Sequence, residues 1–119
     1  MQGQRVLVTG GAGFIGSNLA NRLAVDNDVI VVDDTYLGTP ANLSEDVEFV
    51  ESSILNADFP AAVDVLFHLA GYSSRDMHEE NPQRGCRVNV EGFVNTVEQV
   101  REQGCETVVY ASTSSIYGS

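Results

Sequence analysis

The sequence predicts a single α/β domain built on an open, doubly wound parallel sheet of five strands, with helices on both faces in a three-layer αβα arrangement. Three observations support this fold class. The 119 residues are enough for one domain with its own core. Short β-branched runs alternate along the chain with longer helical stretches, which is typical of βαβ units. Several strand runs are apolar at every position, as in strands that helices cover on both sides.

The first half of the chain begins with a strand at 5–9 and a glycine-rich turn, followed by a helix at about 14–24. Ile15, Leu19 and Leu23 recur every four residues and are predicted to mark the buried face of this helix. Four further strands are predicted, at 28–33, 47–51, 65–69 and 107–111. The strand at 47–51 alternates in polarity, which favours a place nearer the sheet edge.

A long helix is predicted between the fourth and fifth strands. Pro82 fits its first turn, and Gly104 is expected to cap its end. Its apolar stripe, expected to face the sheet, consists of Val90, Val94, Val97 and Val100. The fifth strand is expected to become a sheet edge unless further chain or a partner covers it.

The composition is strongly acidic, with 17 Asp and Glu against 6 basic residues, a formal net charge of -11 and no lysine. Such a charge repels nucleic-acid phosphates and anionic lipid, so neither is an expected partner. Together with the missing lysine it favours a halophilic, salt-adapted protein over an ordinary acidic domain. No apolar run is long enough to span a membrane, and the first residues lead directly into a strand, so a cytoplasmic location is expected.

The two cysteines, Cys86 and Cys105, form no C-x-x-C pair and have no histidine at metal-ligand spacing. They are predicted to be small buried thiols without a disulfide, as suits a reducing compartment. No metal site is expected. His68 lies in an apolar strand and is interpreted as a satisfied core histidine rather than an acid or base.

The turn after the first strand carries G-x-x-G-x-x-G at Gly10, Gly13 and Gly16. The first glycine allows a tight turn, the second allows a pyrophosphate to approach the backbone, and the third allows close packing of helix on strand. The helix amino terminus then offers N–H groups and a positive dipole to phosphates. The alternative is a glycine-rich turn without a ligand, but the preceding strand and following helix favour a dinucleotide site.

Asp33 ends the second strand about twenty residues beyond this loop. A carboxylate there accepts hydrogen bonds from the adenosine ribose hydroxyls and repels a 2′-phosphate. No arginine or lysine follows closely, so NAD is predicted rather than NADP. Asp34 is a candidate to share the role, and a solvated turn is the alternative for Asp33.

These motifs and their order resemble the extended short-chain dehydrogenase/reductase family, in the branch of NAD-dependent epimerases and dehydratases that act on nucleotide sugars. The resemblance is carried by T-G-G-A-G-F-I-G at 9–16, Asp33, H-L-A-G at 68–71, N-V-E-G at 89–92 and S-T-S-S-I-Y-G at 112–118. It covers essentially the whole chain and implies a Rossmann-type domain over residues 1–119.

The resemblance also implies roles for individual residues. It assigns the pyrophosphate to Gly10, Gly13, Phe14, Ile15 and Gly16. It assigns binding of the adenosine ribose to Asp33, with Asp34 beside it. It also implies that the segment closing the fourth strand runs along the cofactor, at Leu69, Ala70 and Gly71. Asn89 is implied to steady strands near the cofactor, against the alternative of an ordinary polar helix residue. Thr113 is implied to be the catalytic hydroxyl that hydrogen-bonds the reacting substrate oxygen.

Three departures from the family pattern affect the expected cofactor contacts and the expected reaction. Ser53 stands where the family often has an adenine-contacting acid. Ser114 and Ser115 replace the acids that dehydratases use, which favours epimerisation or simple oxidoreduction. The family's Tyr-x-x-x-Lys pair is absent, because the chain has no lysine. The chain is therefore expected to be the NAD-binding amino-terminal portion of a longer isomerase, truncated before that helix and the substrate domain and inactive alone.

Other functions remain open at this stage. One alternative is a non-catalytic NAD-binding or regulatory module, and another is a reductase of a different small carbonyl compound. The leading expectation is a nucleotide-sugar substrate. A homodimer through the helix at 82–103 is an expectation from the family only.

Overall fold

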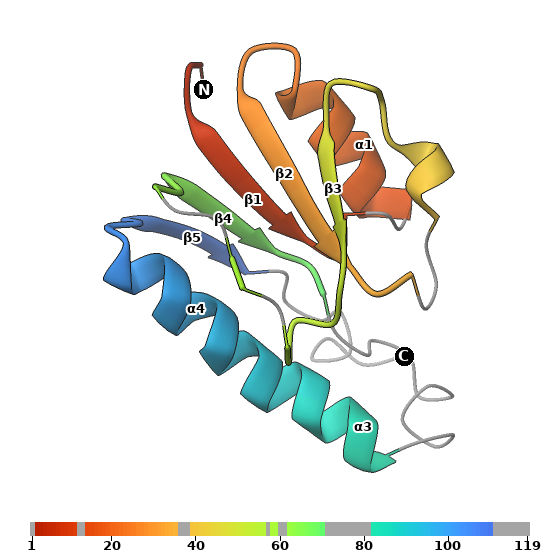
Figure 1. Cartoon of the computed structure of the whole chain (residues 1–119), viewed down its shortest axis with the longest axis vertical. Coiled ribbons are helices and arrows are strands. Elements are labelled where there is room, and N and C mark those ends of the chain that lie inside the picture. Colours follow the sequence, from red (N-terminus) through yellow and green to blue (C-terminus); the bar gives the residue numbers. More distant parts are fainter. Residues whose placement is uncertain are drawn as a thin grey trace, which may run out of the picture.

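The computed structural model describes residues 2–11, 14–35, 39–56, 58–59, 62–70 and 82–110. Its centre is a five-stranded sheet in the order β3-β2-β1-β4-β5 (Figure 1). Every neighbouring pair is parallel. The strands are β1 (Arg5–Thr9), β2 (Asp28–Asp33), β3 (Glu48–Glu51), β4 (Val65–His68) and β5 (Thr107–Tyr110). The strand order reverses beside β1, so the predicted doubly wound sheet is confirmed.

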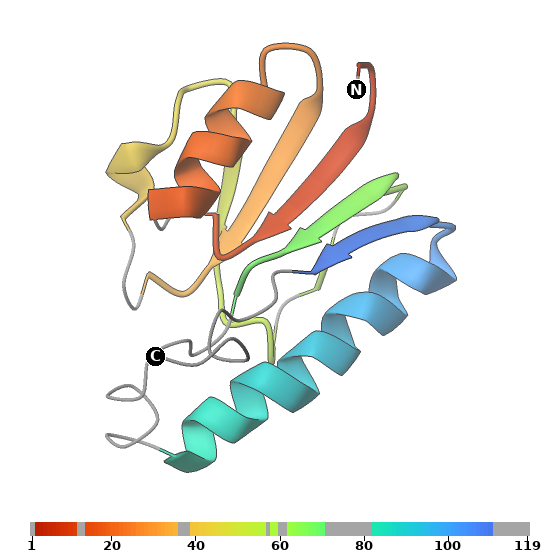
Figure 2. The ribbon, with the colours of Figure 1, turned by 180° about the vertical axis from the view of Figure 1, so that it is seen from behind.

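Helices cover both faces of the sheet, as Figures 1 and 2 show from opposite sides. On one face lie α1 (Phe14–Leu23) and the short 3₁₀ turn η1 (Pro40–Asn42). On the other face one continuous helical segment is formed by α3 (Pro82–Cys86), the π-helical turn η2 (Arg87–Gly92) and α4 (Phe93–Glu102). Alternate residues of the strands point to opposite faces of the sheet and contribute to two separate hydrophobic cores. One core includes Ala20 of α1, and the other includes Val88 and Val100 of the long helix. The three-layer prediction is confirmed.

The buried face of α1 agrees with the predicted one only in part: Leu23 packs against the core, whereas Ile15 does not. Gly16, Ser17 and Ala20 are buried, whereas Ile15 is 73% exposed. Small side chains face the sheet because the helix begins directly at the strand end. A Cβ atom added at Gly16 would overlap the carbonyl oxygen of Gly10. Close packing of helix on strand therefore takes precedence over burial of the larger Ile15 side chain.

The buried stripe of the long helix agrees with the prediction at Val97 and Val100, which pack in the core, but not at the other two valines. Its buried residues are Val88, Gly92, Thr96 and Val100, whereas Val90 and Val94 are exposed. In a regular α-helix every fourth residue drifts by about 40° around the axis. The wider π-turn η2 rotates less per residue and offsets this drift, so that every fourth residue stays on the sheet side. Gly92 lies so close to Ile54 that an added Cβ would collide with its side chain.

The predicted cap at the end of this helix is confirmed. Gly104 has φ of 92°, in the left-handed region that favours glycine. Its N–H donates to the carbonyl of Arg101 at 3.0 Å, and the N–H of Cys105 donates to the carbonyl of Val100 at 3.0 Å. This paired arrangement satisfies the last carbonyls of the helix and directs the chain into β5.

The expectation of buried thiols is wrong for Cys86, which is exposed on α3, while Cys105 is partly buried. Both are free thiols in the structure. Val90, one helical turn after Cys86, is also exposed, so both residues lie on the solvent side of the helix.

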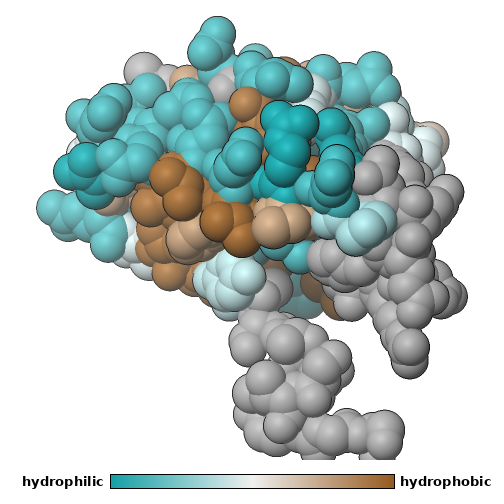
Figure 3. Space-filling view, turned by 90° about the horizontal axis from the view of Figure 1, so that it is seen from below, coloured by the Kyte–Doolittle hydropathy of each residue, from teal (hydrophilic) through white to brown (hydrophobic). Residues whose placement is uncertain are grey.

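Apolar side chains remain exposed at one side of the molecule. Figure 3 shows brown apolar atoms gathered in a band on the face seen from below. The large exposed apolar residues of the long helix and β5 are Val90, Val94, Val108, Val109 and Tyr110. All four residues of β5 are exposed, as expected of an edge strand. In the described part of the chain, no helix combines the length and apolar character needed to cross a bilayer.

Candidate functional site

Gly10 follows β1 directly and brings three backbone segments together. Its φ is 73°, and its N–H donates to the carbonyl of Val32 at 2.9 Å. An added Cβ would lie 2.8 Å from the backbone nitrogen of Ala70 and 2.9 Å from the carbonyl carbon of Leu69. Both the backbone conformation and the available space therefore require glycine. The carboxyl ends of β1, β2 and β4 converge at this residue.

The amino terminus of α1 begins at the same edge of the sheet. Phe14 and Ile15 form its first residues, with side chains 84% and 73% exposed. The first-turn N–H groups of any helix lack partners within the helix, so this end can bind an anion. Gly16 follows with its backbone against Gly10. Gly13 lies outside the described residues.

Asp33 is fixed at the end of β2 by a tight turn. Its carboxylate oxygen Oδ1 accepts a hydrogen bond from the N–H of Thr35 at 2.6 Å, and the residue is 8% exposed. Thr35 has φ of 62°, a left-handed conformation unusual for a β-branched residue. Its hydroxyl donates to Glu51 at 3.0 Å across the strand ends. Strain of this kind is maintained where surrounding contacts hold it, often at ligand sites.

A cation lies closer to this position than the sequence indicated. Nη2 of Arg84, in α3, lies 3.8 Å from Oδ2 of Asp34 and donates to Oγ of Ser53 at 3.4 Å. The expectation that no arginine accompanies the acids holds only for the nearby sequence. The long helix runs antiparallel to the strands, so its first turn lies at their carboxyl ends (Figure 1). A basic residue early in a crossover helix is the signal that could have identified Arg84.

Thr9 organises the segment after β4. Its Oγ1 accepts hydrogen bonds from the N–H groups of Leu69 and Ala70, at 3.2 and 3.3 Å. The same oxygen lies 2.9 Å from Nδ1 of His68. In the tautomer with Nδ1 unprotonated, the Thr9 hydroxyl donates its proton to Nδ1 and keeps its lone pairs for the two N–H groups. Leu69 and Ala70 are thereby held beside the glycine turn.

His68 is buried, at 2% exposure, and packs edge-on against Phe93 and parallel to Tyr110. Desolvation by burial lowers the pKa of His68 from 6.5 to about 4. The imidazole is therefore neutral at neutral pH and acts in packing and positioning. This confirms its interpretation as a satisfied core histidine.

The remaining candidates are placed only in part. Asn89 lies in η2 and is partly buried. Gly71 and Thr113 lie outside the described residues, as do Ser114 and Ser115. The structure thus brings together Gly10, Gly16, Asp33, Asp34, Leu69 and Ala70 at one edge of the sheet, with Arg84 added.

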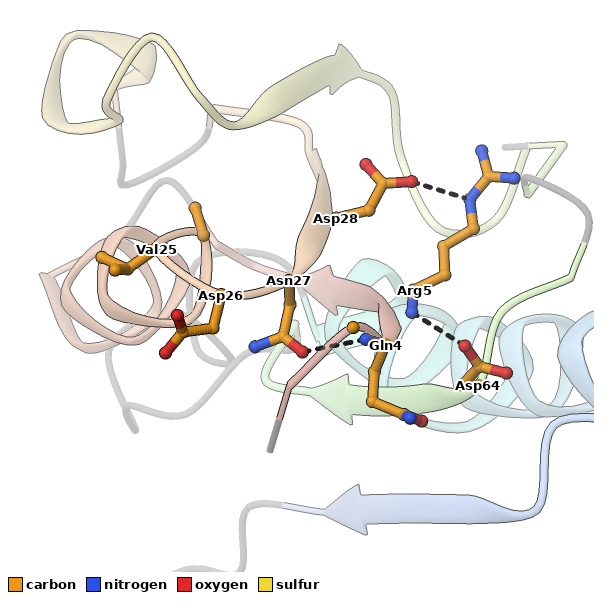
Figure 4. Close-up of a pocket in the computed structure, with 9 residues that line it drawn as sticks. Gln4, Arg5, Val25, Asp26, Asn27, Asp28 and Asp64 are labelled. Carbon is orange, nitrogen blue, oxygen red and sulfur yellow. Dashed lines mark hydrogen bonds and ion pairs between the residues drawn. The ribbon is translucent and has the colours of Figure 1, made fainter.

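The opposite edge of the sheet carries an open depression of about 710 Å³, between the amino ends of β1 and β2 (Figure 4). Its polar groups largely bind one another. Arg5 Nε lies 3.5 Å from Asp28, and the Arg5 N–H donates to Asp64 at 2.8 Å. Ligands of doubly wound sheets bind beyond the carboxyl ends, so the glycine-turn edge is the stronger candidate. Within the described ranges, no group of three or more His, Cys, Asp or Glu is placed to hold a metal ion.

The family model described as "NAD dependent epimerase/dehydratase family" matches residues 6–119. UDP-glucose 4-epimerase of Mycolicibacterium smegmatis is 39% identical over 127 residues, covering 97% of this chain and 41% of that protein. UDP-glucuronic acid decarboxylase 6 of Arabidopsis thaliana is 34% identical over 120 residues, covering 96% of this chain and 35% of that protein. The chain therefore spans well under half the length of these relatives.

A solved structure shares the fold closely. The UDP-N-acetylglucosamine 4-epimerase from Methanobrevibacter ruminantium M1, in complex with UDP-N-acetylmuramic acid, superposes with a TM-score of 0.91 at 29% identity. The match covers 99% of this chain and 40% of that one.

Proposed function

The chain belongs to the NAD-dependent epimerase/dehydratase family, and from this premise we propose that residues 1–119 form the NAD-binding portion of an enzyme that epimerises, or otherwise oxidises and reduces, a nucleotide-activated sugar. The observation that carries this proposal is the meeting of the glycine turn, the amino terminus of α1 and the Asp33 carboxylate at one edge of the sheet. The nucleotide-sugar enzymes among the relatives support the substrate class.

The residues at this edge fit a dinucleotide. Gly10 and Gly16 keep the backbone free of side chains at the turn, and the helix amino terminus supplies N–H donors to a pyrophosphate. The Asp33 carboxylate, fixed by Thr35, can accept from ribose hydroxyls. The proposed NAD-binding residues are Gly10, Gly13, Phe14, Ile15, Gly16, Asp33, Asp34, Leu69, Ala70, Gly71 and Asn89. NAD, when bound, supplies the hydride acceptor and donor for chemistry at a sugar carbon.

Thr113 is the proposed catalytic hydroxyl, which would hydrogen-bond the sugar oxygen that loses and regains a proton. A tyrosine serves as a base at neutral pH only when a nearby cation lowers its pKa, and these 119 residues contain no lysine to pair with one. We therefore propose that this portion binds NAD without turnover and that the full enzyme places the base in its remaining part. Ser114 and Ser115 in place of acids favour epimerisation over dehydration.

The finer expectations are part of the same proposal. A halophilic character is supported by the net charge of -11 and the missing lysine. The isomerase assignment is supported by the epimerases among the relatives, and a cytoplasmic location belongs to the same proposal. A homodimer through the long helix is supported by Val90 and Val94, which are 57% and 53% exposed one turn apart. The dimer is tested by sedimentation of the chain and of Val94→Glu, which should sediment as a monomer if the pair lies in the interface.

The cofactor assignment is tested by titrating NAD and NADP at high salt, with Asp33→Ala as the test variant and Asp46→Ala, an exposed acid elsewhere, as the control. Hydrogen bonds to a charged group are worth about 1.5–3 kcal/mol each, so Asp33→Ala should weaken NAD binding by about 10- to 100-fold. Equal affinity for both dinucleotides, unaffected by Asp33→Ala, would refute the assignment.

The lack of lysine also favours a second candidate, a non-catalytic NAD-binding regulatory module. Gene sequence beyond Ser119 distinguishes the two. A Tyr-x-x-x-Lys motif roughly 20 to 30 residues further on, where the resemblance to the family places it, supports the enzyme. A natural stop codon at that point supports the module.

A further inference from the structure

An ion pair joins the end of β2 to the first turn of α3. Asp34 Oδ2 and Arg84 Nη2 lie 3.8 Å apart, and each side chain is 35% exposed. The same nitrogen donates to Ser53 Oγ at 3.4 Å, beyond the end of β3. Arg84 therefore lies against both strand ends next to Asp33, the residue proposed to bind the adenosine ribose.

We propose that Asp34 and Arg84 together determine which dinucleotide the site accepts, with Asp34 neutralising the guanidinium of Arg84, which would otherwise pair with a 2′-phosphate. This inference rests on the cofactor site of the proposed function. NAD and NADP differ only by that phosphate. In sheets of this type an acid after the second strand binds the 2′-hydroxyl, whereas a nearby arginine accommodates the 2′-phosphate. In this chain Asp34 and Arg84 lie side by side at the end of β2.

The balance of charge explains why NAD is favoured despite the arginine. Three carboxylates lie at this edge, those of Asp33, Asp34 and Glu51, with the last linked to the turn through the Thr35 hydroxyl. Arg84 is the one cation whose contacts place it among them in the described residues. A phosphate monoester carries about -1.5 to -2 charges at neutral pH, so it is repelled. Repulsion of the wrong ligand is a common source of specificity.

Neutralising Asp34 should change this balance in a defined direction. Asp34→Asn keeps the size of the side chain but removes one carboxylate charge beside Arg84. A guanidinium presents several N–H groups in a planar fork that matches phosphate oxygens. The affinity for NADP should therefore rise relative to that for NAD, and the rise should require Arg84.

The chain offers a matched control at the other end of the same strand. Asp28 begins β2 and pairs with Arg5 at 3.5 Å, with side chains 68% and 36% exposed (Figure 4). Asp28→Asn also removes one carboxylate from an exposed Asp–Arg pair, so it makes the same change in net charge. It lies at the edge of the sheet remote from the proposed cofactor site.

The experiment measures NAD and NADP affinities by calorimetry, at one fixed salt concentration, for the wild-type chain, Asp34→Asn, Asp28→Asn, Arg84→Gln and the double variant Asp34→Asn/Arg84→Gln. Asp34→Asn should raise the ratio of NADP to NAD affinity about fivefold, the size expected for one exposed ion pair. The double variant Asp34→Asn/Arg84→Gln should not show this gain, and Asp28→Asn should leave the ratio of NADP to NAD affinity unchanged. Melting temperatures confirm that each variant is folded.

An unchanged ratio in Asp34→Asn, a gain that persists in the double variant, or an equal gain in Asp28→Asn would overturn the inference. The proposed function can fail separately. If the wild-type chain binds neither dinucleotide, the cofactor site itself is wrong, and the inference falls with it. If the wild-type chain binds NAD and Asp33→Ala weakens that binding while Asp34→Asn changes nothing, only the role of Asp34 and Arg84 is refuted.

Discussion

Burial of His68 predicts a specific loss of stability in acid. The folded-state pKa is about 4, whereas an exposed histidine in the unfolded chain has a pKa near 6.5. Between these values the unfolded state binds more protons than the folded state, so the free energy of unfolding falls as the pH falls. The stability from neutral His68 is fully present above pH 6.5 and is lost progressively down to about pH 4. The loss amounts to about 3 kcal/mol.

The test compares the wild-type chain with His68→Asn by urea denaturation at pH 7.5 and pH 4, at constant ionic strength. Asparagine keeps an acceptor for the Thr9 hydroxyl and does not titrate. Both proteins lose stability as their carboxylates become protonated, so only the difference between them reports His68. The wild-type advantage should shrink by about 3 kcal/mol between the two pH values.

The difference between the two proteins at each pH, rather than the stability of either one, provides the control. An advantage over His68→Asn that is the same at both pH values would refute the reasoning, since it would mean that residue 68 takes up no extra proton on unfolding. In the tautomer in which Nδ1 accepts from Thr9, protonation there would also disturb Leu69 and Ala70.

Three further outcomes are expected. Gly10→Ala should lower the free energy of unfolding by about 2–5 kcal/mol, from left-handed strain plus backbone overlap, whereas Gly3→Ala, with φ of 66° and open space, should lose only about 1–2 kcal/mol in the same urea assay. Equal losses would contradict the close approach at Gly10. The melting temperature should rise between about 0.1 M and 1 M KCl, where the screening length falls from about 10 Å to about 3 Å, and a fall would count against salt adaptation. Gly92→Ala should destabilise the chain through contact with Ile54, while Gly104→Ala should do so through its φ of 92° alone. Crystal structures of the two variants would show displacement of Ile54 only in the first.

The sheet could be predicted from sequence because each central strand contains a short run of consecutive apolar residues. The run Val29-Ile30-Val31-Val32 is typical of a parallel strand covered on both faces, and it is buried as β2. The glycine spacing likewise placed the turn after β1, because left-handed φ and close approach leave few other residues possible at Gly10. These features depend on local chemistry, which the sequence displays directly.

What could not be predicted depends on packing between distant segments. The stripe of valines assumed a regular helix, and the π-turn η2 instead buries Val88 and exposes Val90. Arg84 reaches Asp34 across fifty residues of sequence, through the topology that places the first turn of α3 at the strand ends. Neither periodicity nor spacing encodes such contacts. The role of Thr9 as acceptor for the segment after β4 is missed for the same reason.

The absence of a side chain at Gly92 has a consequence far from its own position. The Ile54 side chain occupies the space that a Cβ at residue 92 would fill, and the Ile54 carbonyl accepts a hydrogen bond from Asn95 at 2.6 Å. The loop after β3 therefore packs directly against the surface of the helix. Ser53 is the neighbouring residue, and Arg84 belongs to the same helical segment. A larger side chain at residue 92 would therefore displace the loop that carries Ser53 from the helix that carries Arg84, and it would change the separation of Arg84 from the acids on which the proposed discrimination between NAD and NADP depends.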